Sequence, residues 1–302
     1  MLAAEDVTVR FRKGFRRRPI VALDHLSLRV QEGDFLALLG ENGAGKSTAM
    51  YCFLGLIHPT QGRVLLFGQR PELGGRSYGQ IAYLPEEPHY HLYLTVEEAV
   101  TYYARLSGAR VTTAEVGSVL ERLGLAEFRH LRLSKCSKGM KQKVGIAQCL
   151  FHQPVLLFLD EPMRGLDPII VREFREILAN LHREGATIIM NSHMLSEVEA
   201  LASRVAILDR GRLVAHDTLT NLLRTEQDHY SLELAGADAL PPYLTIRSRN
   251  GGAVQATMPV GSFDDFMSYV RERQLKVSSC VLTRRSLEDS FLSVLRKEKP
   301  DA

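Results

Sequence analysis

The nine residues from Gly40 to Thr48, with the sequence GENGAGKST, have the types and spacing that bind a phosphate chain. Glycines let the backbone turn tightly and point its N–H groups at an anion. Lys46 can reach the terminal phosphates, and Ser47 can offer its hydroxyl to a magnesium ion. The stretch therefore predicts binding of a nucleoside triphosphate. The predicted phosphate-binding residues are Gly40, Asn42, Gly43, Ala44, Gly45, Lys46, Ser47 and Thr48.

Two acidic residues, Asp160 and Glu161, directly follow the apolar run from Val155 to Leu159. A run that is apolar at every position is typical of a parallel strand covered on both faces. In a chain that also has a phosphate loop, this position favours two roles for the acidic residues. One is an aspartate that binds magnesium, and the other is a base that activates a water molecule. The alternative is a carboxylate pair that is merely solvated.

Two further segments carry weaker signals of phosphate chemistry. Ser192 and His193 follow a predicted strand from Thr187 to Asn191, which would deliver them to the same edge of the sheet. Ser137 is placed as an N-cap, and with Gly139 it leaves the N–H groups of a helix start open to a phosphate. Most histidines are structural and most capped helix starts bind nothing, so neither segment identifies a site by itself.

The elements that must position these residues follow from hydrophobic periodicity. The phosphate loop lies between a strand at Phe35–Leu39 and a helix at Ser47–Leu56. Thr95 and Glu98 form a capping box that opens a helical section of about residues 86–153. Further strands are predicted at residues 5–11, 20–30, 64–67 and 81–84, and a terminal hairpin at 205–209 and 212–215.

From about Leu219 the pattern changes to a separate α+β unit. Strands are predicted at residues 230–234, 244–247, 253–258 and 277–283, with a helical face from Phe263 to Val270. Ser286 with Asp289 caps a last helix. We therefore expect a domain of residues 1–218, which contains the helical subdomain, and an accessory domain of residues 219–302.

Composition sets limits on the class of protein. The chain has 302 residues, of which 45% are hydrophobic, and a formal net charge of +3, which favours neither the presence nor the absence of nucleic acid. Its apolar runs are too short to span a bilayer, and its N-terminus lacks a signal-peptide pattern. The cysteines lack CxxC spacing, which favours buried reduced thiols and a cytosolic compartment. They are Cys52, Cys136, Cys149 and Cys280.

Two other segments have alternative interpretations. The basic run from Arg12 to Arg18 favours a solvated loop between antiparallel strands, with attraction to anionic lipid or an acidic partner as the alternative. His89 and His91 have the spacing of a metal-ligand pair, but no third ligand is evident near them in the sequence.

The order GENGAGKST, SKGMKQ, LLFLDEP, GLD and SH, over residues 4–218, resembles the nucleotide-binding subunit of ABC transporters. This resemblance implies an α/β P-loop NTPase core with an antiparallel β subdomain and an inserted helical subdomain. It also implies that two copies, or this chain and a homologous ATPase subunit, clamp two ATP molecules with Mg²⁺. Each ATP would be held by the phosphate loop of one subunit and the SKGM helix start of the other.

The resemblance also assigns roles to single residues. Lys46 and His193 would hold the terminal phosphate, and Glu161 would polarise the attacking water. Asp160 and Ser47 would bind magnesium. The remaining assignments are phosphate contact across the dimer by Ser137 and Gly139, an interface position for Asp167, and stacking on adenine by Phe11. The resemblance also implies that the loop of His89 and His91 contacts a membrane subunit, which is the preferred interpretation of that loop.

Three positions depart from the family pattern. The helix start reads CSKGM where the family has LSGGQ, although the serine and the second glycine remain. Glu86 stands in place of a glutamine; its carboxylate can bind magnesium, but it repels the γ-phosphate where an amide would not. Arg164 stands in place of a serine before GLD. Since the predicted base and lysine are both present, we expect active hydrolysis.

The ending SLEDSFL resembles the C-terminal extension of ABC subunits from exporters, which pair with a separate membrane subunit. The expectation is an ATPase that drives export through an integral membrane permease, with no nucleic-acid partner, at the cytoplasmic face of the membrane. The alternatives are a soluble ABC ATPase acting on nucleic acid or ribosomes, a P-loop enzyme of another class, and a binder that does not hydrolyse. The extension itself has a second interpretation, as a packing and dimer-stabilising appendage.

Overall fold

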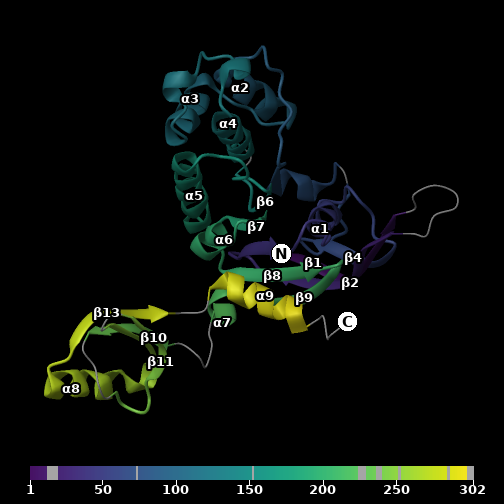
Figure 1. The fold of residues 1–302 in the computed structure, drawn as a ribbon. Helices are drawn as coiled ribbons and strands as arrows, with labels where there is room; N and C mark the ends of the chain where they lie inside the picture. The colour runs from purple at the N-terminus through teal and green to yellow at the C-terminus, as the bar shows by residue number, and fades with distance from the viewer. Residues whose placement is uncertain are drawn as a thin grey trace. The chain divides into compact units, whose positions relative to one another are not determined.

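The computed structural model of the chain describes residues 1–11, 20–72, 74–151, 153–223, 229–235, 240–250, 253–283 and 286–297. The chain forms two compact units, Met1–Leu219 and Thr220–Arg296, which are described separately (Figure 1). The predicted loop from Arg12 to Arg18 lies outside the described residues.

A six-stranded sheet, in the order β5-β6-β7-β3-β8-β9, forms the centre of the first unit. Its strands β3, β6 and β7 are buried at every position, as their apolar sequences predict. They run parallel, and Asn191 of β7 lies in register with Asp160 of β6 on one side and Leu38 of β3 on the other. Their carboxyl ends therefore lie at the same edge of the sheet. The strands are β3 (Phe35–Leu39), β5 (Ile81–Leu84), β6 (Leu156–Asp160), β7 (Thr187–Asn191), β8 (Arg204–Asp209) and β9 (Arg212–Thr218).

A three-stranded antiparallel sheet, in the order β2-β1-β4, forms a second layer of this unit. It shares one hydrophobic core with α1 and with the six-stranded sheet. Strand β4 begins at Gln61, three residues before the predicted start, because Gln61 pairs with Thr8 of β1. Helix α1 ends three residues before the predicted Leu56, at a turn that Gly55 closes with a φ of 69°. The elements are β1 (Leu2–Phe11), β2 (Ile20–Val30), β4 (Gln61–Leu66) and α1 (Lys46–Phe53).

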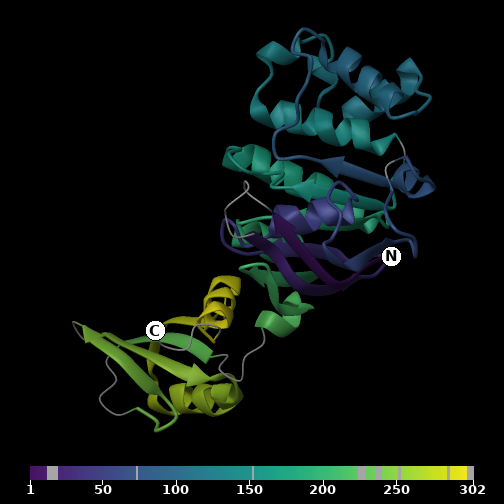
Figure 2. The ribbon, with the colours of Figure 1, turned by 90° about the vertical axis from the view of Figure 1, so that its right-hand side faces the viewer.

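Three helices follow β5 and precede β6, and they gather at one end of the first unit (Figures 1 and 2). The predicted capping box is present: Thr95 accepts from the backbone N–H of Glu98, and the Glu98 side chain accepts from that of Thr95. The helices are α2 (Val96–Leu106), α3 (Thr113–Arg122) and α4 (Lys138–Leu150); α5 (Pro168–Arg183) and α6 (Leu195–Leu201) lie later in the chain. Short 3-10 turns lie at Arg76–Gln80, Ala126–Phe128 and Leu133–Lys135.

The second unit is an antiparallel sheet in the order β11-β12-β10-β13, with its own hydrophobic core. The predicted cap of the last helix is present, because the N–H of Asp289 donates to the Ser286 hydroxyl at 3.1 Å. The elements are β10 (His229–Ala235), β11 (Thr245–Asn250), β12 (Ala253–Pro259), a 3-10 turn (Val260–Ser262), α8 (Phe263–Arg273), β13 (Lys276–Thr283) and α9 (Leu287–Lys297), and α7 (Leu219–Leu223) spans the boundary.

The cysteine prediction is correct for three of the four thiols. Cys52, Cys136 and Cys149 are buried, but Cys280 is exposed. Cys280 lies on β13, an edge strand whose alternate residues face solvent, so the apolar pattern around it did not guarantee burial. None of the helices in the described residues is both long enough and apolar enough to cross a membrane.

Candidate active site

The glycine-rich loop joins β3 to α1 through positions that only glycine fits. A Cβ atom on Gly45 would lie 2.5 Å from the carbonyl oxygen of Ala22, and the φ of Gly45 is 105°. Gly45 is also the N-cap of α1 and supplies no side-chain hydrogen bond. The first N–H groups of α1 therefore have no side-chain cap and are available to an anion.

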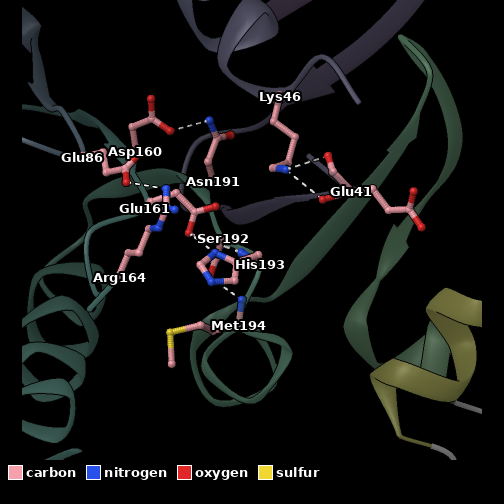
Figure 3. Close-up of polar contacts among 11 residues, drawn as sticks. Glu41, Lys46, Glu86, Asp160, Glu161, Arg164, Asn191, Ser192, His193 and Met194 are labelled. Carbon is pink, nitrogen blue, oxygen red and sulfur yellow. Dashed lines mark hydrogen bonds and ion pairs between the residues drawn. The ribbon is translucent and has the colours of Figure 1, made fainter. Parts of the chain in front are cut away.

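Lys46 is the first residue of α1, and its side chain folds back over the loop. Its ammonium group donates to the carbonyl oxygens of Gly40 at 2.8 Å and Glu41 at 3.2 Å (Figure 3). Only 8% of Lys46 is exposed. Burial lowers the pKa of Lys46 from its usual value, while attraction to Glu161 and Asp160 acts in the opposite direction. The structure thus brings the predicted lysine and the two predicted carboxylates together.

Asp160 is the last residue of β6 and is nearly fully buried. Its Oδ1 accepts a hydrogen bond from Nδ2 of Asn191 at 2.9 Å (Figure 3). Burial, with a smaller contribution from the charge of Glu86, raises the pKa of Asp160, while the Asn191 hydrogen bond and Lys46 lower it. Asp160 is thus a carboxylate held at the strand end with little water around it.

Asn191 is a site residue that sequence reasoning missed. It ends β7, is fully buried, and its Oδ1 has no hydrogen-bond partner in the described part of the chain. A buried polar atom without a partner is costly, which points to a ligand or water in its vicinity. The available signal was a polar residue that ends an apolar strand, the same pattern that identified Asp160.

Glu161 and His193 lie in direct contact at the edge of the sheet. His193 Nδ1 is 2.6 Å from Glu161 Oε2 (Figure 3). The Glu161 N–H donates to the carbonyl of Asn191 at 3.1 Å, which ties the turn after β6 to the end of β7. The φ of Glu161 is 47°, a conformation that side-chain-bearing residues adopt rarely and that often marks functional sites. The carboxylate is therefore held in a fixed orientation.

Ser137, Gly139 and Asp167 all lie at helix starts. Ser137 caps α4, where its hydroxyl accepts from the N–H of Met140 at 3.2 Å, and Asp167 caps α5 by accepting from Ile170 at 3.0 Å. Gly139 lies against α5, and a Cβ on it would be 2.5 Å from Cγ2 of Ile170. A larger residue at this position would therefore force Ile170 to move, so glycine favours this packing independently of any phosphate contact.

We expect Gly139→Ala to lower the melting temperature by about 2–8 °C, because the added methyl overlaps Ile170. Gly117→Ala is the matched control: Gly117 is in the interior of α3, and a Cβ added to it would meet open space, so this change should raise stability slightly. Adding Ile170→Ala to Gly139→Ala should recover part of the loss. Equal melting temperatures for Gly139→Ala and the parent protein would contradict the packing role.

The other predicted site residues have distinct environments. Glu86 pairs with Arg164, which leaves its predicted role in magnesium binding a prediction. Phe11 ends β1 and is 40% exposed, and its contact with adenine also stays a prediction.

The ring of His91 packs against those of Tyr102 and Tyr103. The described residues contain no group of three or more histidine, cysteine or acidic side chains that could hold a metal ion.

A parallel sheet whose glycine-rich loop opens a helix, with a buried lysine facing acidic strand ends, defines a P-loop nucleoside triphosphatase. The family model described as "ABC transporter" matches residues 23–164. The chain is 38% identical to an uncharacterized ABC transporter ATP-binding protein of Nostoc sp., over 99% of this chain and 90% of that one. It is 31% identical to the bacitracin transport ATP-binding protein BcrA of Bacillus licheniformis, over 91% and 92% of the two chains.

Solved structures agree with this assignment. An ATP-binding subunit of an ABC transporter, 32% identical, superimposes with a TM-score of 0.62 over 73% of this chain and 91% of that chain. A dimeric ATP-binding cassette in a post-hydrolysis state, 22% identical, shares the fold with a TM-score of 0.65 over 72% and 99% of the two chains. The chain belongs to the ATP-binding subunits of ABC transporters, and it binds and hydrolyses ATP.

Proposed function

We propose that this subunit drives export through a separate membrane permease, by hydrolysing Mg²⁺-ATP at sites shared between two copies of the chain. The main support for the catalytic part of this proposal is the 2.6 Å contact between Glu161 and His193. It lies at the sheet edge where the charges of buried Lys46 and Asp160 attract each other. These groups supply a base, a residue that orients it, a cation for the phosphates and a carboxylate for a metal ion.

The residues present fit a magnesium ion, which prefers oxygen ligands and keeps several waters. Asp160 supplies a buried carboxylate, and Ser47 supplies an exposed hydroxyl at the start of α1. Asn191 donates a hydrogen bond to Asp160 and would keep that carboxylate in place for the ion. When bound, magnesium would neutralise charge on the phosphates; Glu86 would join its ligands only through a carboxylate that also contacts Arg164.

In this proposal each residue has a separate task. The Lys46 ammonium exchanges its bonds to the Gly40 and Glu41 carbonyls for phosphate oxygens, and so binds the nucleotide. Glu161 accepts a proton from a water aligned for in-line attack. His193, half exposed and bonded to Glu161, keeps that carboxylate in place and faces the γ-phosphate. The loop N–H groups stabilise the charge that develops on the phosphate oxygens.

The second half of each site would come from the partner copy, through the start of α4. This chain carries both halves, the loop from Gly40 to Thr48 and the capped helix start at Ser137, so a second copy is sufficient as the partner. Ser137 can accept from Met140 and still donate its own proton to a γ-phosphate. Asp167, at the start of α5, would lie at the same interface.

Ser137 offers a test that separates helix capping from phosphate contact. Aspartate is as good an N-cap as serine, but its charge would face the γ-phosphate. We expect Ser137→Asp to keep the melting temperature of the parent protein and to lose ATP-dependent dimerisation. Ser137→Ala should lower stability by about 1 kcal/mol and weaken dimerisation less. Normal ATP-dependent dimerisation of Ser137→Asp, measured by light scattering, would contradict the proposed contact.

Support for export through a permease comes from the bacitracin transport relative and from the second unit, whose end resembles the extension of exporter subunits. The proposed location is the cytoplasmic face of the membrane, through the permease, and the proposed partners include no nucleic acid. The test is affinity purification of the tagged chain from detergent-solubilised membranes. Recovery of a polytopic membrane protein supports the proposal, whereas recovery with RNA alone contradicts it.

A further inference from the structure

Glu86 and Arg164, which both depart from the family pattern, contact each other. Arg164 Nη1 is 2.5 Å from Glu86 Oε1, and the two residues are 78 positions apart in the sequence (Figure 3). Arg164 lies in the turn after β6, where its N–H donates to the carbonyl of Glu161 at 3.1 Å. The pair therefore lies next to the proposed base.

Negative charge is concentrated at this place. The charge of Glu86 lies close enough to that of Asp160 for the two to interact, and Glu161 follows Asp160 directly. An incoming triphosphate would add further negative charge, which Lys46 and a metal ion must offset. An unpaired Glu86 carboxylate would repel the phosphates, and Arg164 is the cation that contacts it.

The backbone of Glu86 is fixed independently of its side chain. The buried Gln142 of α4 donates from Nε2 to the Glu86 carbonyl at 2.7 Å. Since this bond holds the segment against α4, removing Arg164 would leave the backbone in place and free only the carboxylate. The charge effect of Arg164 can therefore be separated from a general disruption of the loop.

We propose that Arg164 is a positioning residue that holds and neutralises the Glu86 carboxylate, and so keeps ATP binding strong at a site with an extra acidic side chain. This inference rests on the proposed placement of the phosphates beside Lys46 and Asp160. The two residues act as one unit, since Glu86 without Arg164 would leave an uncompensated negative charge beside the nucleotide.

The test is a double-variant cycle in steady-state ATP hydrolysis with the full chain, comparing Glu86→Gln, Arg164→Gln and the combination. Arg164→Gln should raise the KM for Mg²⁺-ATP about fivefold with kcat changed much less, because the unpaired carboxylate repels the nucleotide. Adding Glu86→Gln should return KM to near the parent value. The raised KM of Arg164→Gln should fall as salt is added, since screening weakens the repulsion.

Controls distinguish the possible outcomes. Arg172→Gln removes an exposed arginine on α5 whose ion pair within the described residues is with Glu176, and its KM should not change. Arg164→Lys keeps the charge and should retain a KM near that of the parent protein. If Arg164→Gln and the combined variant have the same KM, the inference is overturned. If the parent protein itself does not hydrolyse ATP, the proposed function fails instead.

Discussion

Replacing Glu161 with glutamine is expected to lower the kcat of ATP hydrolysis by about 10²–10⁴-fold while leaving ATP binding intact. Glutamine has the same shape as glutamate, but its amide cannot accept a proton from water. The contact with His193 can persist, because the remaining carbonyl oxygen still accepts a hydrogen bond. Phosphate release and nucleotide binding, measured on the same preparation, separate the loss of chemistry from a loss of affinity.

The matched control is Glu176→Gln, which changes an exposed glutamate on α5 whose described ion pair is with Arg172. Its kcat should equal that of the parent protein. His193→Ala should reduce kcat less than Glu161→Gln does, because His193 acts by holding the base. A Glu161→Gln variant with normal turnover would show that another group activates the water.

Replacing Lys46 with methionine is expected to weaken Mg²⁺-ATP binding by about 10–150-fold. This is the effect of losing charge-assisted hydrogen bonds to the phosphates. Methionine keeps most of the buried volume of the side chain. The fold should be retained, because the buried ammonium already has a lowered pKa and its removal takes away a desolvated charge. Isothermal titration calorimetry with ATP measures the affinity, and circular dichroism checks the fold.

The control for this change is Lys276→Met, at the exposed start of β13 in the second unit. It removes a lysine without touching the phosphate loop, so the affinity for ATP should not change. Equal ATP affinity of Lys46→Met and the parent protein would contradict the role of Lys46. Weak binding by both variants would indicate a general effect of lost positive charge.

The centre of the fold could be predicted because its signals are local. Strands β3, β6 and β7 have apolar centres and are buried at every position, and polar residues at their carboxyl ends make the site. Parallel strands end at one edge of a sheet, so the residues that follow β6 and β7 could be placed at the same edge, where Glu161 and His193 are in contact. The glycines of the loop were predictable for the same reason, since their spacing alone implies the turn.

Contacts between distant segments could not be predicted from the sequence. The Glu86–Arg164 pair joins a loop after β5 to a turn after β6, and neither segment carries a pattern that names the other. Gln142 was missed because a polar residue on an amphipathic helix is expected to face solvent, whereas α4 is covered on most sides. Cys280 was predicted to be buried because the pattern of β13 does not reveal that it is an edge strand.

Light scattering of Glu161→Gln with and without Mg²⁺-ATP tests whether two copies of the chain share the ATP site. A site that binds ATP without hydrolysing it keeps the phosphate that bridges the two copies. We expect twice the mass of one chain with ATP and a single chain without it, and no dimer when Ser137→Asp is added. A Glu161→Gln variant that binds ATP and stays a single chain would contradict the claim.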